Sequence, residues 1–406
     1  MLSLVSPAHP GRVVVAALLV LQAQGVVPGT PGHRPGVSPP GPPSFSAPTF
    51  DPLVLDGIRR GAYPGAVLVV GRRDTILFAK GYGRLTWSPS GSVPDPDSTL
   101  WDLASMTKVI ATTTALMLLV ERGRVSLDSP VVRYLPQFNG PGTSAVTVGH
   151  LLTHTSGLRA WLPLNRLARD SAAAMRIVFE QTPQAPPGTR MEYSDFNAIL
   201  LGEIVGRVGW GGPLDAFATH EIFVPLGMRQ TVFRPSRSLA RRTAPTGVWR
   251  GHPVAGVVND QNAARLGGVA GHAGLFATAR DVARFAQFML GEGALPGGPR
   301  LLRPETVRTF TAVAVKARRG ASARTLGWQA LPTGEDVSSA GTLFGPRSYG
   351  HTGWTGTSLW IDPDRNLFVV LLTNRAYAPR ARRPFTVLKE VRGRVADAAA
   401  KALDGR

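Results

Sequence analysis

Strand-like and helix-like segments are unevenly distributed along this chain, and their order limits the folds open to it. Two short apolar runs near the start, 65–70 and 75–79, flank the polar turn 71–74 and predict a β-hairpin. Near the end, 358–361 and 367–373 have the pattern of two further strands. The region between these strands is mostly helical in pattern. Strands at both ends of the chain therefore predict one sheet, with the helical region as an insertion packed beside it.

Four segments predict the main helices. The run 105–122 is apolar nearly all round, as in a buried helix, and Gly123 follows it where a helix C-cap favours glycine. The other three are 197–208, 278–290 and 385–403. The predicted fold class is α/β of the α+β kind: an antiparallel sheet from both chain ends, flanked by helices, with a helical insertion.

The first 48 residues predict export. Arg12 precedes the apolar run 13–21, and small residues follow, which together predict a signal peptide over residues 1–25. An uncleaved N-terminal membrane anchor is the alternative, although the run is shorter than the about 20 residues of a membrane span. Residues 26–48 are rich in proline and glycine and predict an extended linker. We expect an exported protein, periplasmic or extracellular, whose folded domain covers 49–406.

Composition excludes several classes of function. The 406 residues include no cysteine, which excludes disulfide scaffolds, thiolate metal sites and a cysteine nucleophile. The 45 Lys and Arg against 26 Asp and Glu give a net charge of +19, as in many nucleic-acid-binding proteins. The arginines are scattered in short pairs, however, without a long basic run. We therefore expect no nucleic-acid partner, and only a loose association with anionic envelope surfaces.

Ser105 and Lys108 are the strongest candidates for chemistry. Their spacing places a hydroxyl and an ammonium on one face of the predicted helix. The helix N-terminus favours a developing alkoxide, and a desolvated lysine can help to remove the serine proton. The chain has only five lysines, and only Lys108 has a serine three residues before it.

A second candidate segment is Tyr193-Ser194-Asp195. A tyrosine beside a lysine can be held as a phenolate and act as a general base. The alternative is a core tyrosine whose hydroxyl finds a partner. Asp195 likewise has an ordinary role available, as the cap of the helix that follows.

The third candidate segment is His351-Thr352-Gly353, followed by Trp354. A threonine and a glycine on an edge strand offer a hydroxyl to a substrate and allow its backbone to approach closely. The N–H of Trp354 could join that of Ser105 as an oxyanion hole. In isolation, this segment is an ordinary turn.

Taken together and in this order, Ser-x-x-Lys, Tyr-x-Asp and His-Thr-Gly resemble the motifs of the serine β-lactamase and penicillin-binding-protein superfamily. The resemblance is greatest to its class C-type, esterase and D-amino-acid peptidase branch. Segments 151–158, 225–228 and 267–276 are similar to other recurring segments of this family, and the likeness extends over roughly 50–403. The resemblance implies a β-lactamase/transpeptidase-like fold.

The resemblance also implies roles for individual residues, without a metal or a cofactor. Ser105 would be the acylated nucleophile, and Lys108 with Tyr193 would transfer protons. The backbone N–H groups of Ser105 and Trp354 would form the oxyanion hole. The side chains of His351 and Thr352 would face the substrate from the sheet edge.

Two residues depart from the family's pattern. Asp195 replaces the usual asparagine, and its charge beside Lys108 should raise the pKa of that lysine. His351 replaces the more common lysine and is a weaker cation near neutral pH. β-Lactams and peptides with a free C-terminus present a carboxylate to this position. The loss of the fixed charge therefore favours esters or amides as substrates. Arg347 and Arg375 are candidates to restore the missing charge.

Other hydrolase classes lack their motifs here. The sequence has no Gly-x-Ser-x-Gly elbow of the α/β-hydrolase kind, and His220-Glu221 is not followed by the second histidine of a zinc protease. His154 and His272 lie in glycine-bearing loops, where structural hydrogen bonds are expected. We predict an exported serine hydrolase of small-molecule or peptide substrates, with esterase or D-Ala-type carboxypeptidase activity ahead of β-lactam hydrolysis. The alternative is a non-catalytic penicillin-binding or cell-wall-peptide receptor on the same fold.

Overall fold

A computed structural model describes residues 44–316, 323–331 and 338–405. The predicted signal peptide and most of the predicted linker lie outside these residues. The first helix, α1 (Ala47–Arg59), begins at Ala47, so the last two residues assigned to the linker are helical. Pro48 occupies the start of this helix, where a missing N–H costs no hydrogen bond.

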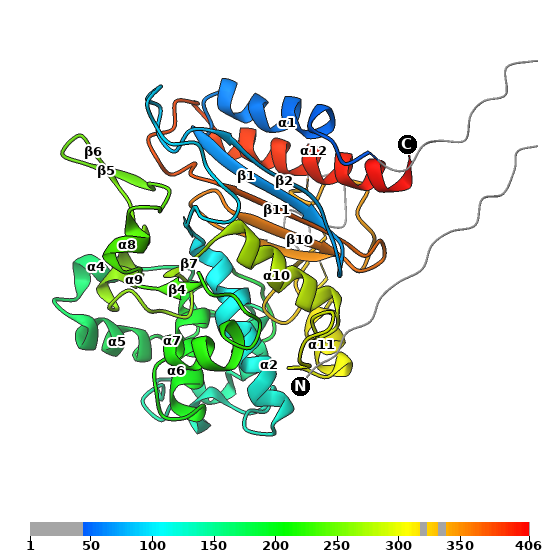
Figure 1. Ribbon diagram of the computed structural model, residues 1–406. Coiled ribbons are helices and arrows are strands. Elements are labelled where there is room, and N and C mark those ends of the chain that lie inside the picture. Colours follow the sequence, from blue (N-terminus) through cyan, green and yellow to red (C-terminus); the bar gives the residue numbers. More distant parts are fainter. Residues whose placement is uncertain (1–43, 317–322, 332–337, 406) are drawn as a thin grey trace, which may run out of the picture. The chain divides into compact units, whose positions relative to one another are not determined.

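The main sheet has six antiparallel strands in the order β2-β1-β11-β10-β9-β8, which confirms that both ends of the chain build it (Figure 1). Val67 and Val69 of β1 face one hydrophobic core, whereas Leu68 and Val70 face the other, as the alternation of a strand requires. The six strands of this sheet are β1 (Gly65–Gly71), β2 (Ile76–Gly83), β8 (Gln329–Ala330), β9 (Tyr349–Thr352), β10 (Ser358–Asp362) and β11 (Leu367–Thr373).

Helices cover both faces of this sheet, so its central strands are buried on both sides. The helices α1 and α12 pack together over one face, and α10 packs on the other face against β1, β10 and β11 (Figure 1). The bounds of the helices after α1 are α2 (Thr114–Glu121), α3 (Val148–Leu152), α4 (Leu164–Leu167), α5 (Ser171–Phe179), α6 (Asp195–Val208), α7 (Leu214–Ala218), α8 (Arg237–Ala240), α9 (Gln261–Arg265), α10 (Ala279–Leu290), α11 (Pro304–Thr311) and α12 (Pro384–Asp404). The predicted helices 197–208, 278–290 and 385–403 are thus confirmed as α6, α10 and α12.

Five short strands complete the structure in the helical region. A three-stranded sheet has the order β3-β7-β4, and a separate hairpin joins β5 to β6. Their bounds are β3 (Trp101–Asp102), β4 (Val232–Phe233), β5 (Gly247–Trp249), β6 (His252–Val254) and β7 (Leu275–Ala277).

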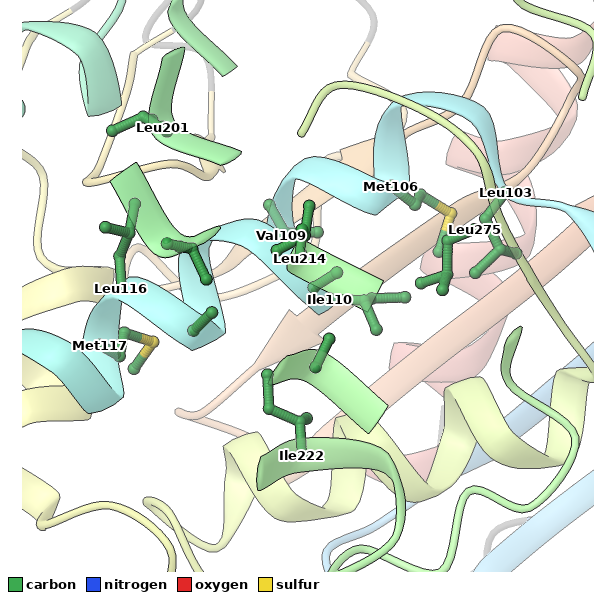
Figure 2. Packing of buried hydrophobic residues seen from close by; sticks show 14 of the residues in the cluster. Leu103, Met106, Val109, Ile110, Leu116, Met117, Leu201, Leu214, Ile222 and Leu275 are labelled. Carbon is green, nitrogen blue, oxygen red and sulfur yellow. The ribbon is translucent and has the colours of Figure 1, made fainter. Parts of the chain in front are cut away.

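The predicted helix 105–122 is helical throughout but not α-helical throughout. A 3₁₀ turn (Ala104–Met106) and a π-helical stretch (Lys108–Thr113) precede α2. Figure 2 shows Met106, Val109 and Ile110 of this run among apolar side chains from other segments. The run is long and apolar enough for a membrane span, but 83% of it is buried inside the protein. It is therefore the central helix of the core, and it positions Ser105 at its start.

Candidate active site

Ser105 lies directly after a residue in a strained backbone conformation. Ala104 has a φ of 47°, in the left-handed region that side chains other than glycine rarely adopt. Asp102 stabilises this turn, since its carboxylate accepts hydrogen bonds from the backbone N–H groups of Ala104 (2.9 Å) and Asn259 (2.7 Å). Burial raises the pKa of Asp102 to about 6, although these two bonds oppose the rise. A buried carboxylate thus fixes the turn that presents Ser105.

Lys108 has an acceptor for each of its three ammonium protons. Its Nζ lies 3.1 Å from Ser105 Oγ, 2.8 Å from Asp195 Oδ1 and 3.1 Å from the His272 carbonyl oxygen. The side chain is only 3% exposed. Burial lowers its pKa, but the charge of Asp195 and the interaction with Tyr193 outweigh burial, and the net effect raises the pKa above its ordinary value. The raised pKa expected from Asp195 is therefore present, and Lys108 is a cation at neutral pH.

Two cationic side chains lie close to the Tyr193 ring. Lys108 Nζ is 5.0 Å from the ring centre, and Arg324 Cζ is 5.1 Å from it. The His154 ring packs against Tyr193 with the ring centres 4.6 Å apart. Both cations are within the distance at which an aromatic ring attracts positive charge.

His154 has the structural role predicted for it. Its Nδ1 accepts a hydrogen bond from the Ser194 backbone N–H at 3.2 Å and lies 3.1 Å from Asn197 Nδ2. Burial, aided by nearby positive charges, holds its pKa well below the usual range. A neutral His154 therefore fixes the segment that carries Tyr193 and the start of α6.

The sequence predicted a structural role for His272 but did not identify its partner, Asp260. His272 Nε2 lies 3.0 Å from Asp260 Oδ1, which also accepts the Ala263 N–H at 2.8 Å and caps α9. Burial alone would raise the pKa of Asp260. His272 and these hydrogen bonds have the larger effect, and the net result is a pKa below the ordinary value. Asp195, Asp260 and His272 offer ligand atoms within 4.8 Å of one another. The ammonium of Lys108, bonded to Asp195, already supplies positive charge there.

A tight turn after β9 is fastened to the segment before Ser105. Thr355 Oγ1 donates to the Asp102 carbonyl oxygen at 2.6 Å, and Thr357 Oγ1 donates to the Leu103 carbonyl oxygen at 3.1 Å. A Cβ on Gly353 would collide with the Leu103 carbonyl oxygen, so only glycine fits. This close approach places the turn after β9 directly against the turn that presents Ser105.

Two backbone donors remain free at this junction. Within the described part of the chain, neither the N–H of Ser105 nor that of Trp354 donates a hydrogen bond to a protein acceptor. Unpaired N–H groups on adjoining turns are the donors that an oxyanion hole requires.

His351 is buried in the candidate site beside Tyr193. The sequence predicted a weak cation there, and the ring is 3% exposed, with its centre 6.1 Å from that of Tyr193. Alternation along β9 directs His351 toward the core, whereas Thr352 is partly exposed. Burial, with the charges of Arg324 and Lys108, lowers the pKa of His351 to about 3. His351 is therefore neutral at physiological pH and supplies no charge for a carboxylate.

The two arginines suggested from the sequence as replacements for that charge lie in different surroundings. Arg347 is exposed and pairs with Asp364, with Nε 2.5 Å from Oδ1. Arg375 donates from Nε and Nη2 to the Trp354 carbonyl oxygen and lies over the Phe385 ring. Arg347 is thus bound to a carboxylate, whereas Arg375 lies against the turn that carries Trp354 and forms no ion pair with a described carboxylate.

Arg324 is a second cation at the site, and nothing in the sequence pointed to it. Its side chain is 8% exposed, and its Nε and Nη1 are buried without an acceptor among the described residues. No described carboxylate forms an ion pair with it, and burial lowers its pKa. Arg324 stands in a short segment without a motif, so only the folded structure shows its proximity to Tyr193.

Comparison with known proteins identifies the family. The β-lactamase family model matches residues 50–392. A protein of Escherichia coli (strain K12) named "Putative D-alanyl-D-alanine carboxypeptidase" is 32% identical over 353 residues, which are 79% of this chain and 80% of that protein.

Solved structures show the same fold at lower identity. The hydrolase EstCE1, described as having promiscuous acyltransferase activity, aligns with a TM-score of 0.70 and 22% identity, over 87% of this chain and 98% of that one. A class C β-lactamase from Rhodobacter sphaeroides aligns with a TM-score of 0.66 and 24% identity, over 84% and 98%. The predicted β-lactamase/transpeptidase-like fold is confirmed, and this chain belongs to the β-lactamase family of serine hydrolases.

Proposed function

We propose that this protein is a serine carboxypeptidase that cleaves peptides ending in a free carboxylate, of the D-Ala-D-Ala type. The observation that carries the proposal is the buried guanidinium of Arg324 beside Tyr193, whose Nε and Nη1 have no acceptor among the residues that the structure describes. A buried cation without a counter-charge is costly, and an anionic ligand offsets that cost. The E. coli relative, named as a putative carboxypeptidase, supports the same choice.

The proposed reaction begins at Ser105. Its Oγ attacks the scissile carbonyl carbon, and its proton passes to Tyr193, which enters this mechanism as a phenolate and becomes a neutral phenol. Lys108 cannot take the proton, because Asp195 holds it as a cation. The N–H groups of Ser105 and Trp354 stabilise the oxyanion. The leaving amine then takes the proton as the C–N bond breaks, which releases the C-terminal amino acid and leaves an acyl-Ser105 ester.

A water molecule completes the cycle. Tyr193 accepts a proton from the water as the hydroxyl attacks the ester, and the proton returns to Ser105 when the acyl group leaves. The donors that hold the oxyanion during acylation serve again here. No group other than the side chains and backbone of this site is needed for the proton balance.

Arg324 can supply the preference for a substrate carboxylate that the replacement of the family's lysine by His351 had put in doubt. His351 is neutral, whereas the Arg324 guanidinium is charged at neutral pH and lies in the same buried cluster. We propose that the carboxylate of the substrate is attracted to this cation. Peptides with a free C-terminus should then be preferred over their amides and over simple esters.

The experiment compares four substrates on the purified protein: a D-Ala-D-Ala peptide, the same peptide as its C-terminal amide, a p-nitrophenyl ester and nitrocefin. We expect turnover of the free peptide to exceed that of its amide. Ser105→Ala should abolish both turnover and labelling by a fluorescent penicillin. Labelling that survives in Ser105→Ala would contradict the assignment of the nucleophile.

Arg324→Gln separates the role of this arginine from a general loss of activity. If Arg324 binds the carboxylate, KM for the free peptide rises while kcat for the p-nitrophenyl ester is unchanged. If Arg324 only supports Tyr193, kcat falls for every substrate, and the preference for the carboxylate has to be abandoned. A persistent acyl-enzyme without turnover of any substrate would instead identify the non-catalytic receptor.

A further inference from the structure

The hairpin formed by β5 and β6 stands apart from the rest of the helical region. Its two strands pair only with each other, and they extend outward beyond α8 in Figure 1. Val248 is 49% exposed and Trp249 is 69% exposed. Because successive residues of a strand point to opposite faces, both faces of the hairpin are left exposed by the residues that the structure describes.

The tip of this hairpin combines apolar and cationic side chains. Trp249 and His252 pair across the strands, and Val248 pairs with the exposed Pro253 on the other face. Arg250 lies in the turn, with its guanidinium 5.6 Å from the centre of the Trp249 ring. Exposed tryptophan and valine on an isolated two-stranded hairpin are unfavourable in water unless an apolar surface covers them.

The sequence around the hairpin is rich in arginine. From residue 229 to residue 259 the chain has six arginines and neither aspartate nor glutamate. Arg237, Arg241 and Arg250 form no ion pair with any residue that the structure describes. The hairpin and its base therefore present unpaired positive charge around an apolar tip.

The base of the hairpin is fixed to the wall of the candidate active site. Asn259 Nδ2 donates to the Thr246 carbonyl oxygen at 2.9 Å, just before β5. The backbone N–H of the same asparagine donates to Asp102 Oδ2 at 2.7 Å. A surface bound by the hairpin would thus be held at a defined distance from the turn that carries Ser105.

We propose that the β5–β6 hairpin docks the protein on an anionic phospholipid bilayer, with the Trp249 side chain in the headgroup region. An indole ring partitions into the interface between water and hydrocarbon, and arginines around it contact the phosphate groups. A soluble polyanion would satisfy the arginines but would leave Val248, Trp249 and Pro253 in water. The apolar tip therefore favours a bilayer over an anionic polysaccharide. This proposal is independent of the reaction proposed above.

The absence of cysteine from the sequence allows a specific test. In the full chain, Trp249→Cys creates a single thiol that carries an environment-sensitive nitrobenzoxadiazole label. We expect its emission to shift to the blue and rise several-fold with phosphatidylglycerol vesicles, but not with phosphatidylcholine vesicles. The matched control is the label at Trp210→Cys, an exposed tryptophan outside the hairpin, which should not respond.

Charge reversal tests the arginines. In the labelled protein, Arg241→Glu with Arg250→Glu should weaken the vesicle response at least about 25-fold, since each arginine near an anionic surface contributes about fivefold. Arg124→Glu with Arg133→Glu changes the net charge equally but lies elsewhere and should have little effect. Turnover of a soluble ester should be unchanged in all variants, which shows that each is folded.

Three results would overturn the proposal. The first is a label at position 249 that does not respond to phosphatidylglycerol, even if the vesicles bind the chain through another segment. The second is an equal response of the labels at 249 and 210. The third is a response at 249 to dextran sulfate but not to vesicles, which would identify a soluble polyanion as the partner.

Discussion

Lys108 Nζ lies 2.8 Å from Asp195 Oδ1, and this ion pair determines the charge state of the candidate site. The lysine is buried, and burial alone would lower its pKa and make it a base. The carboxylate of Asp195 reverses that effect. The asparagine that is usual in this family at this position carries no charge and would not reverse it. The aspartate therefore shifts the role of proton acceptor toward Tyr193.

Replacing Asp195 by Asn should make this shift visible in the pH dependence of the reaction. The amide removes the negative charge, so the pKa of Lys108 should fall, and the alkaline limb of the kcat/KM profile should move to lower pH. A fluorescent active ester measured over the alkaline range gives this limb. Asp215→Asn, which removes a carboxylate paired with Arg234 at the surface, is the control. An unchanged limb in Asp195→Asn would mean that Lys108 is not part of the titrating unit.

Gly353→Ala should be strongly damaging because two atoms lie too close to position 353 for a side chain. Its Cβ would collide with Thr357 Oγ1 and with the Leu103 carbonyl oxygen, and relief of these collisions moves either the Ser105 turn or the turn after β9. Overpacking of this kind costs about 1–3 kcal/mol of stability. Gly212→Ala is the matched control, since a Cβ there would meet nothing within 4 Å. Thermal unfolding and penicillin labelling measure both effects, and normal labelling of Gly353→Ala would refute the argument.

Thr355→Val tests whether the turn after β9 depends on its attachment to Asp102. The variant keeps the side-chain shape but removes the 2.6 Å hydrogen bond to the Asp102 carbonyl oxygen. We expect kcat to fall about tenfold or more while KM changes little, since the Trp354 N–H is displaced from the oxyanion. Thr311→Val removes a hydroxyl bond to Val307 in α11, away from the site, and should leave kcat unchanged. Equal effects of the two variants would show that the attachment matters only for stability.

The sequence predicted the elements that local patterning controls. The strands 358–361 and 367–373 and the helix 197–208 have clear apolar periods and turn residues, and the structure has them as β10, β11 and α6. The Ser105–Lys108 contact was also predictable, because three residues of helix bring these side chains together. What was predicted at the site is thus mainly what is close in sequence.

Contacts between distant segments at the site were predicted only where the family resemblance implied them, as for Lys108 and Asp195. The other contacts could not be predicted. Asp260 stands 12 residues from His272, and no local pattern pairs the two. Arg324 has no motif around it, and its place beside Tyr193 depends on how the segment before β8 packs. That His351 is a weaker cation than lysine follows from its residue type, whereas its burial, which lowers the pKa to about 3, depends on the whole fold.

The two buried histidines make a final prediction about stability. Burial lowers the pKa of His154 and His351 below the ordinary value of 6.5, so in the folded protein both are neutral where the unfolded chain binds protons. The unfolded state therefore gains protons as pH falls below about 6.5, and the free energy of unfolding should fall with it. Asp102, whose pKa is raised to about 6, opposes this trend between about pH 6 and pH 4, because there the folded state binds the extra proton.

His351→Gln isolates one of these contributions. Glutamine does not titrate, so the dependence of the free energy of unfolding on pH should become shallower by up to about 1.4 kcal/mol per pH unit between about pH 6 and pH 4. Urea unfolding at several pH values in this range measures the slope. His252→Gln, at an exposed position of the β5–β6 hairpin, should leave the slope as in the parent protein. If His351→Gln and the parent have the same slope, His351 is protonated equally in both states, and the buried neutral imidazole beside Tyr193 and Arg324 is not the ground state of this site.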